Sequence, residues 1–481
     1  MEYEAVIGME VHAQILTRSK MFCGCSADYA AAPPNTHTCP VCLGMPGVLP
    51  VINHAAVIAT IRTGLALGCD VPAFSKFDRK NYTYPDLPKG YQISQFDYPL
   101  CTYGALDIVS DGQPKRMRIR RVHLEEDTGK LMHAPSGSVI DFNRAGVPLM
   151  EIVSEADLRT AEEAWQYLLK LRAILRYLGV NSGNMEEGAL RCEANISIRP
   201  VGSAEFGTKV EVKNLNSFRA VRMAIAYELE RQAQALESGA GVQQVTMGWD
   251  DVAHRTVVQR TKESSEDYRY FPEPDLPPLE FTPEQVAAWR ATLPELPDAR
   301  RQRFVAQLGL READAALLAE DREVGDYYER AVAVSMGASE PQTIANWTLG
   351  ELFRLVGENG QPLAAGQVSP EGLVGLLRLV GQGAINQTVA KDVLAEMFRT
   401  GQAADAIVQL RGLTQISDAE ALRGVIAAVL DDNPKPVQQY LAGEIKVLGF
   451  LTGLVMRATR GQANVALMRE LLAQEIEKRR A

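Results

Sequence analysis

The chain opens on a strand-like alternation of hydrophobic and polar residues. Residues 3–14 read YEAVIGMEVHAQ, and a period of two places Glu10 and His12 on one face, opposite an apolar face. A carboxylate beside an imidazole can bind a metal ion, although a histidine at the edge of a core gives the same pattern. The alternation predicts a strand and leaves the role of its polar face open.

A second alternating run covers residues 116–126 and places His123 and Glu125 on one face, with Glu126 on the other. Asp127 follows, so three acids stand in a row before a Thr-Gly turn. Like charges this close repel one another unless a cation or a proton relieves them. The run therefore indicates either a charged site or a solvated outer face.

A third run, residues 139–144, is expected to form a hairpin with the second and to place Asp141 and Asn143 on one face. Such a hairpin would gather carboxylates and an imidazole into a small area. The prediction concerns both the strand and its partner.

The clearest strand pattern lies in residues 190–199 and 208–216, which predict a hairpin with Glu193 and Glu211 on its polar face. One such face is typical of an ordinary exposed sheet. Four in one half of a chain favour a shared sheet surface lined with hard oxygen ligands, which suit Mg²⁺ or Mn²⁺. The chain has no Walker-type glycine loop and no Gly-x-Gly-x-x-Gly, which disfavours P-loop and Rossmann nucleotide sites.

Helical periodicity appears at 160–178, where Thr160 and Glu163 form a capping box, and again after Ser217. The motif LPELP at 293–297 marks a domain boundary, and the pattern beyond it is helical. We expect an α+β fold, in which an N-terminal antiparallel-sheet domain precedes all-α C-terminal modules. The expected domains are residues 1–292, 293–405 and 406–481.

The charge and the distribution of apolar residues argue against several classes of protein. A net charge of −10 over 481 residues argues against a protein that coats nucleic acid, although residues 446–481 carry seven Lys or Arg and three acids. The segment 446–481 is therefore either an RNA-binding surface or a charged helix without a binding partner. No apolar run of about 18 residues predicts a membrane span, and the acidic N-terminal segment does not fit a signal peptide. We expect a cytoplasmic protein.

Four of the seven cysteines are clustered as Cys23-x-Cys25 and Cys39-Pro-x-Cys42. Two close pairs across a short loop can close a tetrahedral site, so we expect a structural Zn²⁺ with no open coordination position. Four reduced thiols or a redox pair are the alternatives.

Residues 74–99 mix cations such as Lys80 with several tyrosines. This composition suits a nucleotide or a single-stranded RNA end, because cations contact phosphate and aromatic rings stack on bases. A packed aromatic loop with extended cations fits equally well.

Together these motifs resemble GatB, the B subunit of the bacterial tRNA-dependent amidotransferases, over essentially the whole chain. The runs that carry the resemblance are GMEVHAQ (8–14), CPVCLGMPGVLP (39–50), DRKNYTYPDLPKGYQISQ (78–95), HLEEDTGK (123–130), DFNRAGVPLMEIVS (141–154), LRCEANISIR (190–199), VEVKNLNSF (210–218), YRYFPEPDLP (268–277) and VLGFLTGLVMRATRGQANVALMRELL (447–472).

The resemblance implies a cradle-like catalytic domain with a zinc knuckle at 1–292 and a tRNA-binding tail module at 406–481. It implies a heterotrimer in which GatB is joined by an amidase subunit, which hydrolyses glutamine, and by a small third subunit. GatB would bind mischarged Glu-tRNA(Gln) or Asp-tRNA(Asn), phosphorylate the side-chain carboxylate with Mg–ATP, and receive ammonia from glutamine.

By the same resemblance the residues around the Mg²⁺ are expected to be Glu10, His12, Glu125, Glu151, Glu193 and Glu211. Phosphate contacts are expected from Lys80, Arg191 and Lys213. Glu193 departs from the family, which commonly has Asp there, so its reach differs by one methylene group. Glu126 faces away from Glu125 and is the expected control.

Two other functions remain compatible with the sequence. One is a free-standing ATP-dependent carboxylate–amine ligase that works as a single polypeptide on a free amino acid. The other is a non-enzymatic, zinc-stabilised tRNA-binding scaffold, whose acids are merely solvated surface. The sequence leaves the choice between Glu-tRNA(Gln) and Asp-tRNA(Asn) open.

Overall fold

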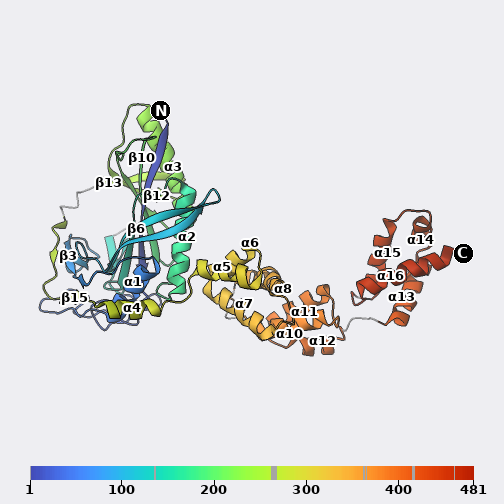
Figure 1. The fold of residues 1–481 in the computed structure, drawn as a ribbon. Helices are drawn as coiled ribbons and strands as arrows, with labels where there is room; N and C mark the ends of the chain where they lie inside the picture. The colour runs from blue at the N-terminus through green and yellow to red at the C-terminus, as the bar shows by residue number, and fades with distance from the viewer. Residues whose placement is uncertain are drawn as a thin grey trace. The chain divides into compact units, whose positions relative to one another are not determined.

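Two units, residues 1–297 and 298–481, divide the chain in the computed structural model, which describes residues 2–134, 137–261, 268–360, 363, 366–413, 418–459 and 461–480. The first unit contains the strands, and the elements of the second, among its described residues, are helices joined by turns and loops. The α+β organisation expected from the sequence is confirmed (Figure 1).

The strands of the first unit are β1 (Tyr3–Gln14), β2 (Phe74–Ser75), β3 (Asp78–Asn81), β4 (Tyr91–Ser94), β5 (Cys101–Ser110), β6 (Gln113–Glu126), β7 (Lys130–Ala134), β8 (Gly137–Asp141), β9 (Pro148–Ser154), β10 (Leu190–Pro200), β11 (Val210–Leu215), β12 (Val245–Asp250), β13 (Arg255–Thr261), β14 (Phe271–Pro272) and β15 (Leu279–Glu280). Buried and more exposed positions alternate along β5, in the first half of β6 and along β10, whereas β9 and β12 are buried at nearly every position.

Eight strands form the main sheet in the order β13-β12-β11-β10-β1-β9-β6-β5. Neighbouring strands are antiparallel except for β11 and β12, which are parallel. β1 lies between β9 and β10, and its register places Glu10 beside Glu193 and His12 beside Glu151. The polar face of the first strand is therefore flanked by polar residues on both sides.

Helices α1 (His54–Ala66), α2 (Ala161–Tyr177) and α3 (Phe218–Glu237) pack against the sheet and bury its apolar face (Figure 1). The Thr160 hydroxyl accepts the Glu163 N–H, as a capping box predicts, but the Glu163 carboxylate instead accepts from the backbone N–H of Arg159. α4 (Pro283–Ala291) begins with a complete capping box at Thr282.

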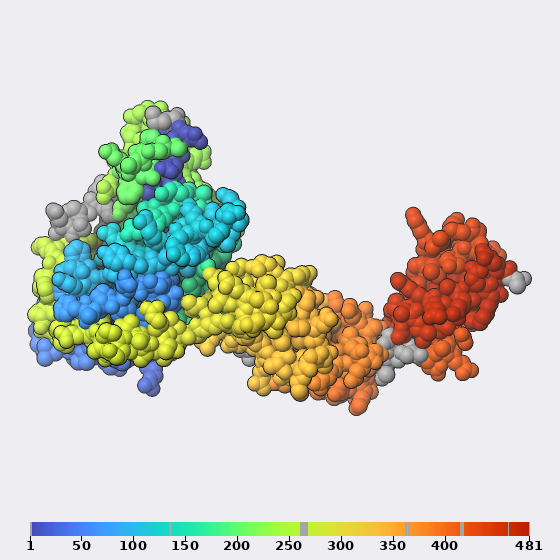
Figure 2. All heavy atoms as spheres, viewed as in Figure 1, coloured from blue at the N-terminus to red at the C-terminus, as the bar shows by residue number. Residues whose placement is uncertain are grey.

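The expected hairpin between residues 116–126 and 139–144 is wrong. β8 ends at Asp141 and pairs with β7, whereas β6 pairs with β5 and β9. Asp141 and Asn143 lie instead beside the cysteine loop, where Asn143 accepts a hydrogen bond from the backbone N–H of His37. Residues 74–99 also contain the short strands β2, β3 and β4 within their loops. The tip of the β5–β6 hairpin projects from the body of the first unit (Figure 2).

The second unit contains two hydrophobic cores, one spanning Phe304–Val408 and one spanning Leu422–Ile476. None of the described helices is long and apolar enough to cross a membrane. The helices are α5 (Pro297–Leu308), α6 (Glu312–Glu320), α7 (Arg322–Ser335), α8 (Pro341–Trp347), the π-helical η2 (Thr348–Leu352), α9 (Phe353–Asn359), α10 (Pro370–Gly381), α11 (Gln387–Thr400), α12 (Ala404–Arg411), α13 (Ala419–Asp432), α14 (Pro434–Leu441), α15 (Val447–Ala458), α16 (Val465–Glu477) and the 3₁₀ turn η4 (Lys478–Arg480).

Candidate functional site

The polar face of the main sheet gathers carboxylates and imidazoles into two neighbouring clusters. The first cluster consists of His12, Glu125 and Glu151, and the second of Glu10, Glu193 and Glu211; within each, one donor atom per residue lies within 4.8 Å of the others. Five strands supply these residues. The six side chains predicted around a metal are thus brought together, while their chemical roles stay a prediction.

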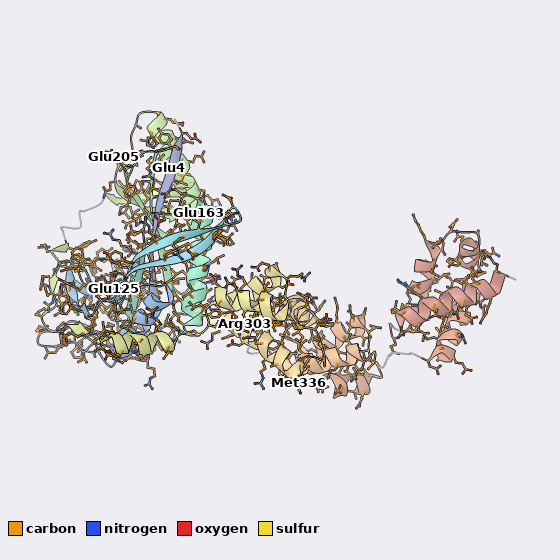
Figure 3. The ribbon with its side chains drawn as sticks, in the orientation of Figure 1. Glu4, Glu125, Glu163, Glu205, Arg303 and Met336 are labelled. Atoms are coloured by element: carbon orange, nitrogen blue, oxygen red, sulfur yellow. The ribbon has the colours of Figure 1, made fainter. Side chains whose placement is uncertain are left out.

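The first cluster is built on adjacent strands, because the register aligns His123, Glu151 and His12 on β6, β9 and β1. The Nε2 atom of His123 lies 3.2 Å from Glu151 Oε2, and that of His12 lies 3.6 Å from the same oxygen. Both imidazoles also lie 3.8 Å from Glu125. Figure 3 labels Glu125 at this place in the first unit.

Burial by itself would lower the pKa of His12, but the nearby carboxylates, above all Glu151, raise it to about 9. Burial opposes ionisation of Glu151, yet His123 and His12 hold its pKa well below the usual value. The pKa of Glu125 is also lowered against burial, first by its hydrogen bond with His123. The two carboxylates thus favour protonated imidazoles, and the imidazolium charges favour ionised carboxylates. A bound cation would balance the carboxylate charge in place of those protons.

The second cluster is more strongly anionic. Burial and the charges of Glu151 and Glu193 raise the pKa of Glu10. Lys213 Nζ lies 2.7 Å from Glu193 and 3.9 Å from Glu211, and it supplies positive charge at the edge of the group. Three ionised carboxylates and one ammonium group carry a net negative charge, which a divalent cation could balance. Their oxygen atoms are the ligands that Mg²⁺ prefers.

Several neighbours that fix these ligands were not singled out from the sequence. The Ser94 hydroxyl donates to Glu125 at 3.1 Å, the Thr246 hydroxyl donates to Glu211 at 2.8 Å, and the Asn195 amide donates to Glu10 at 2.8 Å. His123 contributes directly to the first cluster, and its Nδ1 atom has no hydrogen-bond partner among the described residues. The strand alternation places His123 on the same face as Glu125. No sequence pattern marks Thr246 or Ser94.

The three predicted phosphate contacts differ in their surroundings. Lys80 is half-buried near the first cluster, and Glu125 raises its pKa against the effect of burial. Lys213 contacts the second cluster. Arg191 instead donates to Asp127 at 2.8 Å, so its guanidinium group is already paired with a buried carboxylate.

The acidic run is not a solvated turn. Glu125, Glu126 and Asp127 are each only 2–3% exposed. Glu126 accepts a hydrogen bond from the Ile93 N–H, and its carboxylate lies 2.6 Å from Lys89 Nζ. Glu126 faces away from Glu125, but its buried ion pair makes it unsuitable as a neutral control.

The four clustered cysteines also converge. The sulfur atoms of Cys23, Cys25, Cys39 and Cys42 lie within 4.8 Å of one another and could bind a metal ion. A hydrogen bond from Cys23 lowers the pKa of Cys42 to about 4 despite burial, with help from the Cys39 N–H and the charge of Lys20. A stabilised thiolate is the form that binds metal.

A cavity of about 280 Å³ opens beside the second cluster. Glu10 and Asn195 lie on its wall, and its other charged or aromatic lining residues are Arg120, Glu155, Phe206 and Lys209. Small-molecule pockets start at roughly 300 Å³. The volume and lining fit part of a nucleotide.

Comparison with known proteins gives a consistent result over both units. Residues 5–287 match the GatB/GatE catalytic domain, and residues 326–476 match the GatB domain. The chain is 53% identical to the B subunit of the aspartyl/glutamyl-tRNA(Asn/Gln) amidotransferase of Roseiflexus sp. (strain RS-1), covering 100% of both chains. It is 54% identical to the protein of that name from Thermomicrobium roseum, covering 99% of both. The corresponding protein of Thermoanaerobacter sp. (strain X514) is 50% identical, with 99% of this chain and 100% of the relative covered.

Proposed function

The chain belongs to the GatB family of tRNA-dependent amidotransferase subunits, and we propose that its sheet face uses Mg–ATP to phosphorylate the side-chain carboxylate of Glu-tRNA(Gln) or Asp-tRNA(Asn). The observation that carries the proposal is the convergence of six carboxylate and imidazole ligands on one face of the sheet. Both clusters would hold Mg²⁺, which would offset the negative charge of the phosphate groups when bound.

The reaction needs an activated acyl group, because an ionised carboxylate is a poor electrophile. A carboxylate oxygen attacks the γ-phosphorus of ATP, the bond to ADP breaks, and an acyl phosphate forms. Ammonia then attacks the acyl carbon, phosphate leaves with the C–O electron pair, and one proton is released. Lys80 and Lys213 border the clusters and are placed to stabilise charge on the transferred group.

The 280 Å³ cavity is our candidate for the nucleoside part of ATP. It adjoins Glu10, so a nucleotide seated there would direct its phosphates toward both clusters. Arg120 and Lys209 offer cations to the phosphates, and Phe206 offers a ring to the base.

Three further parts of the proposal concern structure and partners. The four cysteines would hold a structural Zn²⁺, because four sulfur ligands complete its tetrahedral coordination. The protein would work in a complex with an amidase subunit, as the source of ammonia, and with a small third subunit. The helical core spanning Leu422–Ile476 would bind tRNA, and Lys446, Arg457 and Arg469 are exposed there.

Transamidation by the purified complex tests the proposal, and Glu125→Gln is the informative variant. Removing this carboxylate should lower ATP-dependent transamidation by roughly 10²–10³-fold, the cost of losing one preorganised charge-stabilising group. The glutaminase activity of the amidase subunit should be retained. Glu280→Gln, at an exposed position outside the clusters, is the matched control.

The assay also separates the alternatives. ATP consumption by the wild type without aminoacyl-tRNA would contradict the proposal and favour a free-standing carboxylate–amine ligase. Full activity of Glu125→Gln would favour a tRNA-binding scaffold. Parallel reactions with Glu-tRNA(Gln) and Asp-tRNA(Asn) identify the substrate.

A further inference from the structure

Four aromatic side chains line the approach to the first cluster, and we call them the aromatic platform: Tyr82, Phe96, Tyr268 and Tyr270. The rings of Phe96 and Tyr270 are stacked, with centroids 4.2 Å apart and planes 10° apart. Tyr268 makes edge contacts with Tyr82 at 6.0 Å and with Tyr270 at 6.1 Å. The platform therefore joins residues that are far apart in the sequence into one continuous surface.

The inner end of the platform lies at the candidate site. Lys80 Nζ is 5.0 Å from the centre of the Tyr268 ring. Burial raises the pKa of Tyr270. The charge of Lys80 lowers this pKa and that of Glu125 raises it, so the phenol interacts electrostatically with the first cluster and its neighbouring lysine. Lys80 thus contacts the platform and interacts electrostatically with Glu125 of the first cluster.

The outer end of the platform is accessible. Phe96 is 45% exposed although its ring is stacked on Tyr270, so part of the ring is open to a ligand. The backbone of Phe96 is held independently of its ring, since its N–H donates to Asp78 and its carbonyl accepts from Arg121. The ring is thus presented on a fixed backbone.

A cation stands beside the exposed ring. Arg121 shares its strand face with His123 and Glu125, and its guanidinium group donates to the Phe96 carbonyl at 3.4 Å. Its Nε atom is buried and makes no hydrogen bond to any described residue. A stacking surface next to a guanidinium group is the combination that binds a base and its phosphate in single-stranded nucleic acid.

We infer that the exposed face of Phe96 stacks the 3′-terminal adenine of the mischarged tRNA while Arg121 contacts its phosphate. The inference rests on the proposed function, because that reaction requires the amino acid esterified to the terminal ribose to reach the first cluster. A base on Phe96 extends the stack of Phe96 and Tyr270 outward. Its ribose, and the amino acid attached to it, then lie on the side of Lys80 and Glu125. Phe96 is accordingly a positioning residue.

The test compares Phe96→Ala, Phe96→Tyr and the control Phe74→Ala in the full chain assembled with the amidase and the small third subunit. Phe74 is 39% exposed and makes an edge contact with Tyr98, so it matches Phe96 in type and exposure but lies outside the platform. Loss of one base stack should raise the KM for Glu-tRNA(Gln) by about 5- to 150-fold. The kcat and the KM for ATP should change little, Phe96→Tyr should restore wild-type KM, and Phe74→Ala should leave it unchanged.

A spectroscopic measurement reports the stack directly. An RNA oligonucleotide ending in CCA, with 2-aminopurine as the terminal base, should lose fluorescence on binding the wild type and Phe96→Tyr, and should keep it with Phe96→Ala. An unchanged KM in Phe96→Ala, equal quenching by all variants, or failure of Phe96→Ala to assemble into the complex would overturn the inference; the last outcome would make the platform a protein interface. None of these outcomes touches the proposed function, which fails separately if the wild type consumes ATP without aminoacyl-tRNA.

Discussion

Replacement of Glu10 by Gln should stabilise the metal-free chain while weakening its response to magnesium. In the second cluster the carboxylates of Glu10, Glu193 and Glu211 have oxygen atoms within 4.8 Å of one another. Two unit charges at that distance repel by about 3.5 kcal/mol at an effective dielectric constant of about 20. Glu10 faces two such charges, and the amide retains an acceptor for the hydrogen bond from Asn195.

Solvent screening and the ammonium group of Lys213, 2.7 Å from Glu193, offset most of this repulsion. A net gain of about 1–2 kcal/mol remains in the presence of chelator, which corresponds to a rise of roughly 2–3 °C in the Tm of a unit of this size. Added magnesium should reduce or reverse the difference in stability between the variant and the wild type. At tenfold excess over its Kd it stabilises the wild type by about 1.4 kcal/mol, and the variant should lose most of that gain.

Differential scanning calorimetry of the full chain, with EDTA and then with a magnesium titration, measures both effects. Glu187→Gln, which removes one exposed carboxylate outside the clusters, should move neither Tm nor its magnesium dependence. A Glu10→Gln variant that is less stable than the wild type in EDTA would refute the repulsion argument. A variant with an undiminished magnesium response would refute the assignment of Glu10 to a cation site.

The remaining predictions concern other parts of the first unit. Cys42→Ser should lower bound zinc from about one equivalent to less than half and destabilise the unit, because it removes one of the four proposed sulfur ligands. Metal analysis and thermal unfolding measure both effects. Cys69→Ser, at a cysteine outside the group, should retain the metal. Burial would raise the pKa of Glu163, but Lys115, the Arg159 N–H and Ser110 lower it. The ionised Glu163 therefore stabilises the fold above pH 4.5, the usual pKa of a glutamate, and this stabilisation is lost as the pH falls through the lower pKa of the folded state. Urea unfolding of Lys115→Met should therefore show a deficit of about 1–3 kcal/mol at pH 6 that shrinks below pH 4, and a deficit independent of pH would contradict this linkage.

The two-residue period predicted the faces of the strands, because side-chain direction is a local property of extended backbone. It correctly grouped Glu10 with His12 and His123 with Glu125. It could not identify strand partners, which depend on contacts between distant segments. The hairpin assigned to residues 139–144 failed for that reason, since β6 in fact pairs with β9.

The same limit applies to the residues that hold the site in place. Thr246 donates to Glu211 across a parallel pair of strands, and no spacing rule connects positions so far apart. Arg191 was expected to contact phosphate, but its guanidinium group is paired with Asp127, which follows the end of β6. Family resemblance supplied Glu151, because a single acid in the apolar run PLMEIVS has no local pattern that marks it as a ligand.

The second cluster has a consequence for how the chain is made. Glu10 lies on β1 and Glu211 on β11, and β1 must also pair with β9 and β10 before the cluster is complete. At a synthesis rate of about 5–20 residues per second, the first ligand waits roughly 10–40 s for the last to emerge. A nascent chain therefore carries its N-terminal strand without its partners for that time. Cation binding at the proposed site would require β1, β10 and β11 to be in register, so a chain truncated before β11 would fail to bind magnesium at this cluster.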